Sequence, residues 1–173
     1  MPLNYIITDG SAKDMIKIKL NYILSAIVAV LLILCTASIY GPVHFNNEKA
    51  HRETAVKERL YAIRKAELKY RQLHGSYTAD FKQLTDSKLL KEEMQYIPFS
   101  DKKKFELATT IYTGKSGGTT PLMECRAPYA AYLDGLSEKR INEITETANS
   151  TGEYPGLKIG DITTPNDNAG NWE

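Results

Sequence analysis

Histidine and cysteine, the residues most often found in metal and nucleophilic sites, are scarce in this chain. Its 173 residues include three histidines and two cysteines. Two cysteines cannot build a disulfide framework. Cys35 lies in an apolar run, so we do not expect it to pair with Cys125, which falls in a predicted strand and is expected to be buried. The motifs CxxC, HExxH, GxGxxG and the phosphate-binding loop are also missing, so the sequence gives little support to an enzyme.

A large excess of charge of either sign is missing too. Lys and Arg number 22 and Asp and Glu 21, giving a net charge of +1. This balance argues against a nucleic-acid-binding protein, which is normally basic. The charge is nevertheless uneven: residues 44–74 carry eight basic and four acidic side chains, whereas residues 124–173 carry four and nine. Solvated faces explain this pattern, and attraction between copies of the chain is the alternative.

One long apolar run stands out from an otherwise polar sequence. The 24 residues Leu20–Val43 contain no charged side chain. As a helix they would reach about 36 Å, against a hydrocarbon core of about 30 Å. The run therefore predicts a single membrane-spanning helix, with Val28, Leu31 and Leu32 near its centre, and it excludes a polytopic membrane protein.

Three interpretations of the run compete. The first is an uncleaved anchor, which the length of the run favours, because signal peptides usually have about 7–15 apolar residues. The second is a secretory signal cleaved near the small residues Thr36–Ser38. The third is a lipoprotein signal ending at Cys35, which the bulky Leu34 before it disfavours.

The charges beside the run indicate its orientation. Lys13, Lys17 and Lys19 precede it, whereas the first cations after it are Lys49 and Arg52. Because cytoplasmic flanks carry the excess of positive charge, we expect a cytoplasmic N-terminus. We therefore expect three parts: a cytoplasmic tail 1–19, a transmembrane helix 20–43 in a bacterial inner membrane, and a periplasmic domain 44–173.

A second helical stretch is expected from about residue 46 to residue 74, after a kink or pause at Pro42. Its apolar side chains recur at helical spacing: Val56, Leu60, Ile63, Ala66, Tyr70 and Leu73. This stripe predicts packing on the chain's own domain, or else a coiled-coil partner. Glu53–Lys57 and Glu67–Arg71 are expected to form ion pairs between successive turns, and Gly75 is expected to end the helix.

The rest of the domain predicts short helices and a small sheet. Helical pieces are expected at Thr78–Leu84, Ser87–Met94, Pro128–Leu136 and Ser137–Asn149, with Thr78, Ser87 and Ser137 as caps. Alternating side chains predict a hairpin of Phe105–Thr113 and Pro121–Ala127 and a last strand at Leu157–Ile162. Trp172 is expected to anchor the terminal loop. We therefore predict an α+β fold in which the long N-terminal helix covers a small antiparallel sheet.

Two segments resemble the major pseudopilins of type II secretion and the related type IV pilins. The segment Ala62–Leu84 is similar to the end of their long helix, with Tyr70, Gly75 and Tyr77 in the same order. Pro42 occupies a place similar to a proline of the family's membrane segment. The terminal NDNAGNW, Asn166–Trp172, is similar to the turn that closes major pseudopilins.

The resemblance implies a non-enzymatic structural subunit whose N-terminal helix is both membrane anchor and filament core. It also implies a calcium ion in the C-terminal loop, with Asp167 as the first candidate ligand and Asp161 as the second; the bland alternative is an Asn/Asp-rich turn. The chain departs from the family where prepilins carry a glycine and a glutamate, because Ser25 falls near the glutamate's place. A prepilin peptidase site is therefore missing.

Two functions remain open from the sequence. The first is a pilin-like structural or assembly subunit of an envelope machine for secretion or pilus formation, in contact with lipid, other envelope proteins and possible copies of itself. The second is a membrane-tethered binding or adaptor module of a transport complex that does not assemble with itself. No nucleic acid is expected as a partner.

Overall fold

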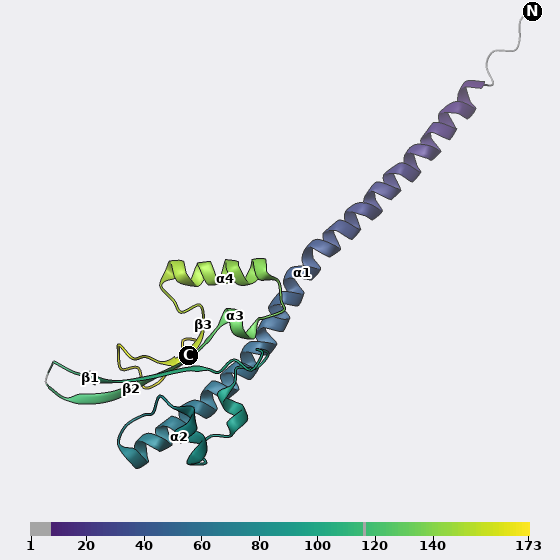
Figure 1. Cartoon of the computed structure of the whole chain (residues 1–173). Coiled ribbons are helices and arrows are strands. Elements are labelled where there is room, and N and C mark those ends of the chain that lie inside the picture. The colour runs from purple at the N-terminus through teal and green to yellow at the C-terminus, as the bar shows by residue number, and fades with distance from the viewer. Residues whose placement is uncertain (1–7, 116) are drawn as a thin grey trace, which may run out of the picture. The chain divides into compact units, whose positions relative to one another are not determined.

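The computed structural model describes residues 8–115 and 117–173. It divides into two compact units, of which the first ends at Asn46 and the second runs from Asn47 to Glu173. The first unit is helical where it is described, and the second, which we call the head, contains a three-stranded antiparallel sheet (Figure 1). The arrangement is α+β, as predicted.

One helix, α1 (Thr8–His74), contributes to both units. It begins inside the predicted tail 1–19, of which residues 1–7 lie outside the described residues. The pause predicted at Pro42 is wrong, because Pro42 lies inside the helix. A proline removes one helical hydrogen bond at about 3 kcal/mol, and the helix-forming turns on both sides outweigh that local cost.

The head part of α1 buries the predicted stripe. Four of its side chains are buried in the head: Val56, Leu60, Ile63 and Ala66. This confirms the interpretation that the stripe packs on its own domain. The stripe ends earlier than predicted, since Tyr70 is half-buried and Leu73 is exposed. Gly75 ends the helix as expected, with a φ of +82° and its N–H bonded to the carbonyl of Arg71 at 2.8 Å.

Arginines of α1 connect the helix to distant parts of the head. Arg52 donates to the carbonyl oxygens of Tyr132 at 3.1 Å and Asp134 at 2.8 Å. Arg64 donates to the carbonyl oxygen of Asn168 at 3.1 Å and pairs with the Glu173 carboxylate at 3.2 Å. The Arg64–Glu173 ion pair is therefore one attraction between the basic helix and the acidic C-terminal region that operates within a single chain.

The first short helix after α1 is α2 (Phe81–Asp86), whose start differs from the prediction. Asp80, not Thr78, is its N-cap, and the Asp80 carboxylate accepts from the N–H of Lys82 at 2.8 Å. The Thr78 hydroxyl instead accepts from the N–H of Asp80 at 3.1 Å. Thr78 therefore shapes the turn that leads into the helix.

The helix predicted at Ser87–Met94 is mostly wrong. Ser87 is the C-cap of α2 rather than an N-cap, and the segment forms only the single 3-10 turn η1 (Glu92–Gln95). The N–H groups of Leu89 and Leu90 both bond to the carbonyl of Leu84, at 3.0 and 3.1 Å. The chain thus folds back on α2 and cannot start a new helix there.

The sheet follows the predicted hairpin closely. Its strands are β1 (Glu106–Thr113), β2 (Thr119–Pro128) and β3 (Gly156–Gly160), in the order β1-β2-β3. Thr109 lies opposite Met123, and Cys125 opposite Ile159. Met123, Cys125 and Ile159 have no exposed surface, which confirms that Cys125 is a buried residue.

Two more helices and a terminal segment complete the head. The helices are α3 (Tyr129–Tyr132) and α4 (Glu138–Thr151), the latter starting after Ser137 as predicted. The terminal segment lies along β3, where Gly170 forms a bridge with Ile159. Trp172 donates its indole N–H to the Tyr61 hydroxyl at 3.0 Å, so Trp172 anchors the chain end to α1.

Candidate membrane and assembly surfaces

The apolar part of α1 is long and apolar enough to cross a membrane. Its most apolar window has a mean hydropathy of 2.5, and none of that window is buried. The three central side chains named from the sequence, Val28, Leu31 and Leu32, are 49%, 54% and 62% exposed. A helix that is apolar all round and lacks protein cover is typical of a membrane span.

The polar atoms within this apolar part are partly satisfied by the helix itself. The Thr36 hydroxyl donates to the carbonyl oxygens of Leu32 and Ile33, at 3.0 and 2.9 Å. Such bonding to the preceding turn leaves a hydroxyl without need of water. Thr36 is thus compatible with a hydrocarbon environment.

Two tyrosines near the ends of the apolar run were missed by the sequence reasoning. Tyr22 and Tyr40 are 75% and 72% exposed. Along a helix, their 18-residue separation corresponds to about 27 Å, which is close to the hydrocarbon thickness of about 30 Å. Tyrosines at this spacing are typical of the aromatic belts at membrane interfaces. Their positions in the sequence alone could have revealed this signal.

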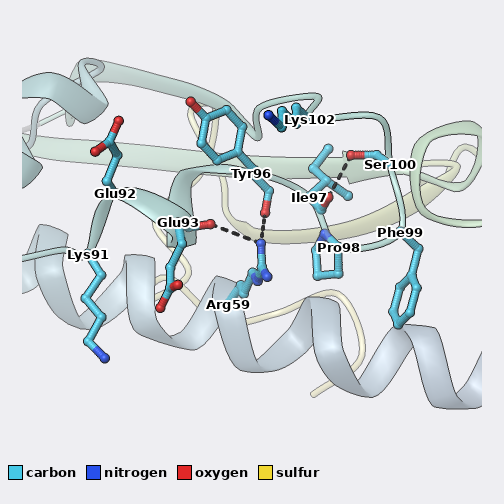
Figure 2. Close-up of a pocket in the computed structure, with 10 residues that line it drawn as sticks. All are labelled: Arg59, Lys91, Glu92, Glu93, Tyr96, Ile97, Pro98, Phe99, Ser100 and Lys102. Carbon is cyan, nitrogen blue, oxygen red and sulfur yellow. Dashed lines mark hydrogen bonds between the residues drawn. The ribbon is translucent and has the colours of Figure 1, made fainter.

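A groove in the head is a second candidate surface, and the sequence gave no sign of it. Its volume is about 770 Å³, and Figure 2 shows α1 facing the segment of residues 91–102 across it. Arg59 donates to the carbonyl oxygens of Glu93, at 3.0 Å, and Tyr96. Both bonds come from the same nitrogen, Nη1, so Arg59 ties the groove wall to α1 through one end of its guanidinium.

Phe99 occupies one end of this groove, pointing toward α1 (Figure 2). It is 44% exposed and has a φ of +59°, in the left-handed region. Its ring lies 5.0 Å from the Arg52 guanidinium and 5.8 Å from the His51 ring. This partly exposed aromatic ring beside the Arg52 guanidinium is a feature that a binding partner could use.

Catalytic geometry is not evident in the part of the chain that the structure describes. The Ser100 hydroxyl in the groove donates to the carbonyl oxygen of Ile97 at 2.7 Å and faces no base (Figure 2). Residues 114–118 have the spacing GxSxG, but they connect β1 to β2. That nucleophile motif requires a turn from a strand to a helix, so the match is coincidental.

The carboxylate of Asp161 already has donors. It accepts from the Lys158 ammonium at 3.2 Å and from the N–H groups of Thr163 and Thr164 at 2.7 and 3.2 Å. Bonds from Thr163 and from Lys158 lower the Asp161 pKa. A calcium ion would have to displace this lysine, so Asp161 does not fit the predicted role well.

The other predicted ligand, Asp167, is exposed in the terminal loop. Asp167 and Asn168 have φ values of +53° and +57°. Among the described residues, no group of three or more His, Cys, Asp or Glu side chains is placed to hold a metal. The side chain of the loop that the fold uses is Asn168, which is buried and donates to the Tyr77 hydroxyl at 2.8 Å. Calcium binding stays a prediction from the resemblance.

Glu67 is the most unusual polar group in the head. Its side chain is fully buried, its Oε2 accepts from the Thr78 N–H at 3.0 Å, and its Oε1 has no hydrogen-bond partner among residues 8–115 and 117–173. The ion pair predicted with Arg71 is therefore wrong, because Arg71 lies over the Tyr77 ring instead. Burial raises the pKa of Glu67 to about 7, and burial, with a smaller contribution from the Glu67 charge, raises the pKa of the Cys125 thiol.

Comparisons with protein-family models, with curated proteins and with solved structures each find no match. The assignment of a function therefore depends on the chain's own residues and on the resemblance of its segments.

Proposed function

We propose that this chain is a non-enzymatic, single-pass membrane protein of the pilin and pseudopilin type, a structural or assembly subunit of a bacterial envelope machine. In this proposal residues 20–43 anchor it in the inner membrane. The N-terminus is cytoplasmic, and residues 44–173 form the periplasmic domain.

The exposed, uncharged helix in residues 20–43 carries the proposal. It is the same helix, α1, that supplies Val56, Leu60 and Ile63 to the core of the head. A helix that serves as anchor and then as the support of a small antiparallel sheet is the design that the resemblance implies. The residues that carry the resemblance also take part in the fold: Tyr70 bonds to Gln83, Gly75 ends α1, and Trp172 bonds to Tyr61.

The groove beside Arg59 favours a second candidate, a membrane-tethered binding or adaptor module. The partly exposed Phe99 and the cations around the groove would contact a protein of a larger transport complex. In this alternative, copies of the chain do not assemble with one another.

Replacing Leu31 by glutamate tests the anchor. A charge at the centre of a spanning helix costs about 2.5–3.5 kcal/mol of insertion free energy, so we expect Leu31→Glu, and likewise Val28→Glu, to lower the carbonate-resistant membrane fraction. The matched control is Leu73→Glu on the same helix, since Leu73 is also exposed, at 65%. Equal membrane fractions for Leu31→Glu and the control would contradict the anchor.

Chemical cross-linking in intact membranes separates the two candidates. With a lysine-reactive reagent, a structural subunit gives a series of bands at multiples of the chain mass, whereas an adaptor gives one band containing a different protein. Phe99→Ala should remove the band with a different protein if the groove binds that protein. It should leave a series of bands at multiples of the chain mass unchanged, because Phe99 lies in the groove and not in the anchor.

A further inference from the structure

The two edges of the sheet differ in how they are covered. The terminal segment covers the β3 edge, where the Gly160 N–H bonds to the Ala169 carbonyl at 2.9 Å and the Asn171 N–H to the Lys158 carbonyl at 3.0 Å. At the other edge β1 pairs with β2 alone among the described residues. Figure 1 shows the β1–β2 hairpin extending beyond the rest of the head. The sheet therefore has a single open edge.

Printed bonds at both ends of β1 fix the direction of its backbone groups. The Gly114 N–H bonds toward the β2 side, to Gly118 at 2.8 Å, whereas the Phe105 N–H bonds to Gln95 on the opposite side at 3.0 Å. Directions alternate along an antiparallel strand. Even-numbered residues of β1 thus face β2, and the N–H and C=O groups of residues 107, 109, 111 and 113 point to the open edge.

The outer half of this edge lacks the usual protection against pairing. Charged residues, prolines or bulges protect natural edge strands from pairing with another chain. The segment Thr109–Thr113 contains no charged residue and no proline. It consists of β-branched and aromatic residues, which favour strands. Ile111 is 68% exposed and Tyr112 37%. The outward backbone groups of this segment can therefore form hydrogen bonds with another strand.

We propose that β1 pairs with β1 of a second copy, antiparallel and about a two-fold axis at Thr110. In this register Leu107 lies opposite Thr113 of the copy and Thr109 opposite Ile111, so every outward backbone group of both strands gains a partner. Glu106, at the start of the strand, lies opposite the uncharged Gly114 of the copy, so this register brings no like charges together. A parallel pair would instead bring Glu106 against Glu106 and Lys115 against Lys115, which is unfavourable.

A single open edge limits the assembly that forms through the sheet to two copies. A two-fold contact uses the same surface on both copies and closes at two. The β3 edge is already bonded to the chain's own terminal segment, so the sheet cannot extend further in that direction. The contact involves the head alone, and it stands whether or not residues 20–43 lie in a membrane.

Cysteine cross-linking of the full chain tests the register. Thr110 pairs with its own copy across the axis at a position without hydrogen bonds, where Cα atoms are about 4.5 Å apart, which is within reach of a disulfide. In a Cys35→Ser background, with Cys125 buried, Thr110→Cys is expected to give a covalent dimer under mild oxidation. Thr119→Cys, exposed on β2 of the same hairpin, is the control and should stay monomeric.

A proline separates backbone pairing from side-chain contact. Ile111→Pro removes an N–H that points away from β2, so the hairpin keeps its own bonds and the edge loses a donor. Added to Thr110→Cys, Ile111→Pro should abolish the covalent dimer, whereas Ile111→Thr, which keeps the N–H, should retain it. Equal dimer with Thr119→Cys, equal dimer with Ile111→Pro, or a disulfide to a different protein would each overturn the proposal.

Discussion

The two halves of α1 contrast sharply, although one helix contains both. In residues 20–43 large apolar side chains are exposed on every side, including Leu31 and Leu32. In the head, the helix presents one buried stripe, represented by Leu60 and Ile63, and its other faces are mostly polar, with Leu68 and Leu73 among the exposed exceptions. The second half obtains its hydrophobic stabilisation from the head. The described large apolar side chains of residues 20–43 are exposed, so this surface requires a lipid or protein environment.

Replacing a leucine by alanine in each half of α1 tests whether the two halves contribute differently to the stability of the head. Leu60 has no exposed surface, so Leu60→Ala is expected to lower the free energy of unfolding of the head by about 2–5 kcal/mol. Leu32→Ala, at an exposed position, is expected to change it by less than about 0.5 kcal/mol.

The fluorescence of Trp172, the single tryptophan of the chain, can follow both unfolding curves in detergent. Because Trp172 bonds to Tyr61 on α1, its signal reports the docking of the chain end on the helix. Equal losses for the two variants would mean that the halves are not energetically distinct.

The buried Glu67 should make the stability of the head depend on pH, whereas the exposed half of α1 contains no such buried charge among residues 20–43. Its folded pKa is about 7 against an ordinary 4.5, so the folded chain keeps a proton that the unfolded chain releases. The contribution of Glu67 to the free energy of unfolding is then fully present below pH 4.5 and is lost as the pH rises through 7. The loss between pH 4 and pH 8 should be about 3 kcal/mol.

Glu67→Gln is the matched variant, because an amide oxygen can still accept from the Thr78 N–H. The difference in unfolding free energy between native chain and variant should shift in favour of the variant by about 3 kcal/mol from pH 4 to pH 8. Urea titrations at both pH values measure this shift. A difference independent of pH would show that the carboxyl group titrates normally.

The end of the stripe shows where sequence periodicity fails. Steps of three and four residues placed Val56, Leu60, Ile63 and Ala66 correctly, because a helical face depends only on helix geometry. They also placed Leu73 in the stripe, and the spacing of four residues paired Glu67 with Arg71. Which residues near the end of a helix are covered depends on where the following segment returns, and here it returns over Glu67 through Thr78.

The remaining differences have a similar origin in non-local contacts. Alternation predicted β1 and β2 to within two residues, since the period of a half-buried strand is local. The groove beside Arg59 was not predictable, because its wall forms when Arg59 bonds the carbonyls of Glu93 and Tyr96, more than thirty positions away. The apolar span was readable from composition alone.

The terminal segment offers a smaller test of the head. Asn171 accepts from the Lys158 N–H at 3.1 Å and donates to the Gly156 carbonyl at 3.0 Å. Asn171→Ala removes both bonds and should cost about 1–2 kcal/mol, with Asn142→Ala on α4 as an exposed control. Hydrogen exchange at the β3 amides should increase in the first variant only. Unchanged exchange would contradict the covering role of this segment.

The smallest expected effect concerns the predicted calcium loop. Asp167 has a positive φ. Asparagine tolerates this backbone conformation, whereas alanine there lowers the free energy of unfolding by about 1 kcal/mol. In a chelator, Asp167→Asn should therefore melt with the native chain and Asp167→Ala slightly below it, so asparagine is the proper charge control. If calcium binds here, adding it raises the Tm of the native chain and leaves Asp167→Asn unchanged. An equal rise in both would place any bound calcium elsewhere, because only the native chain keeps the carboxylate in the loop.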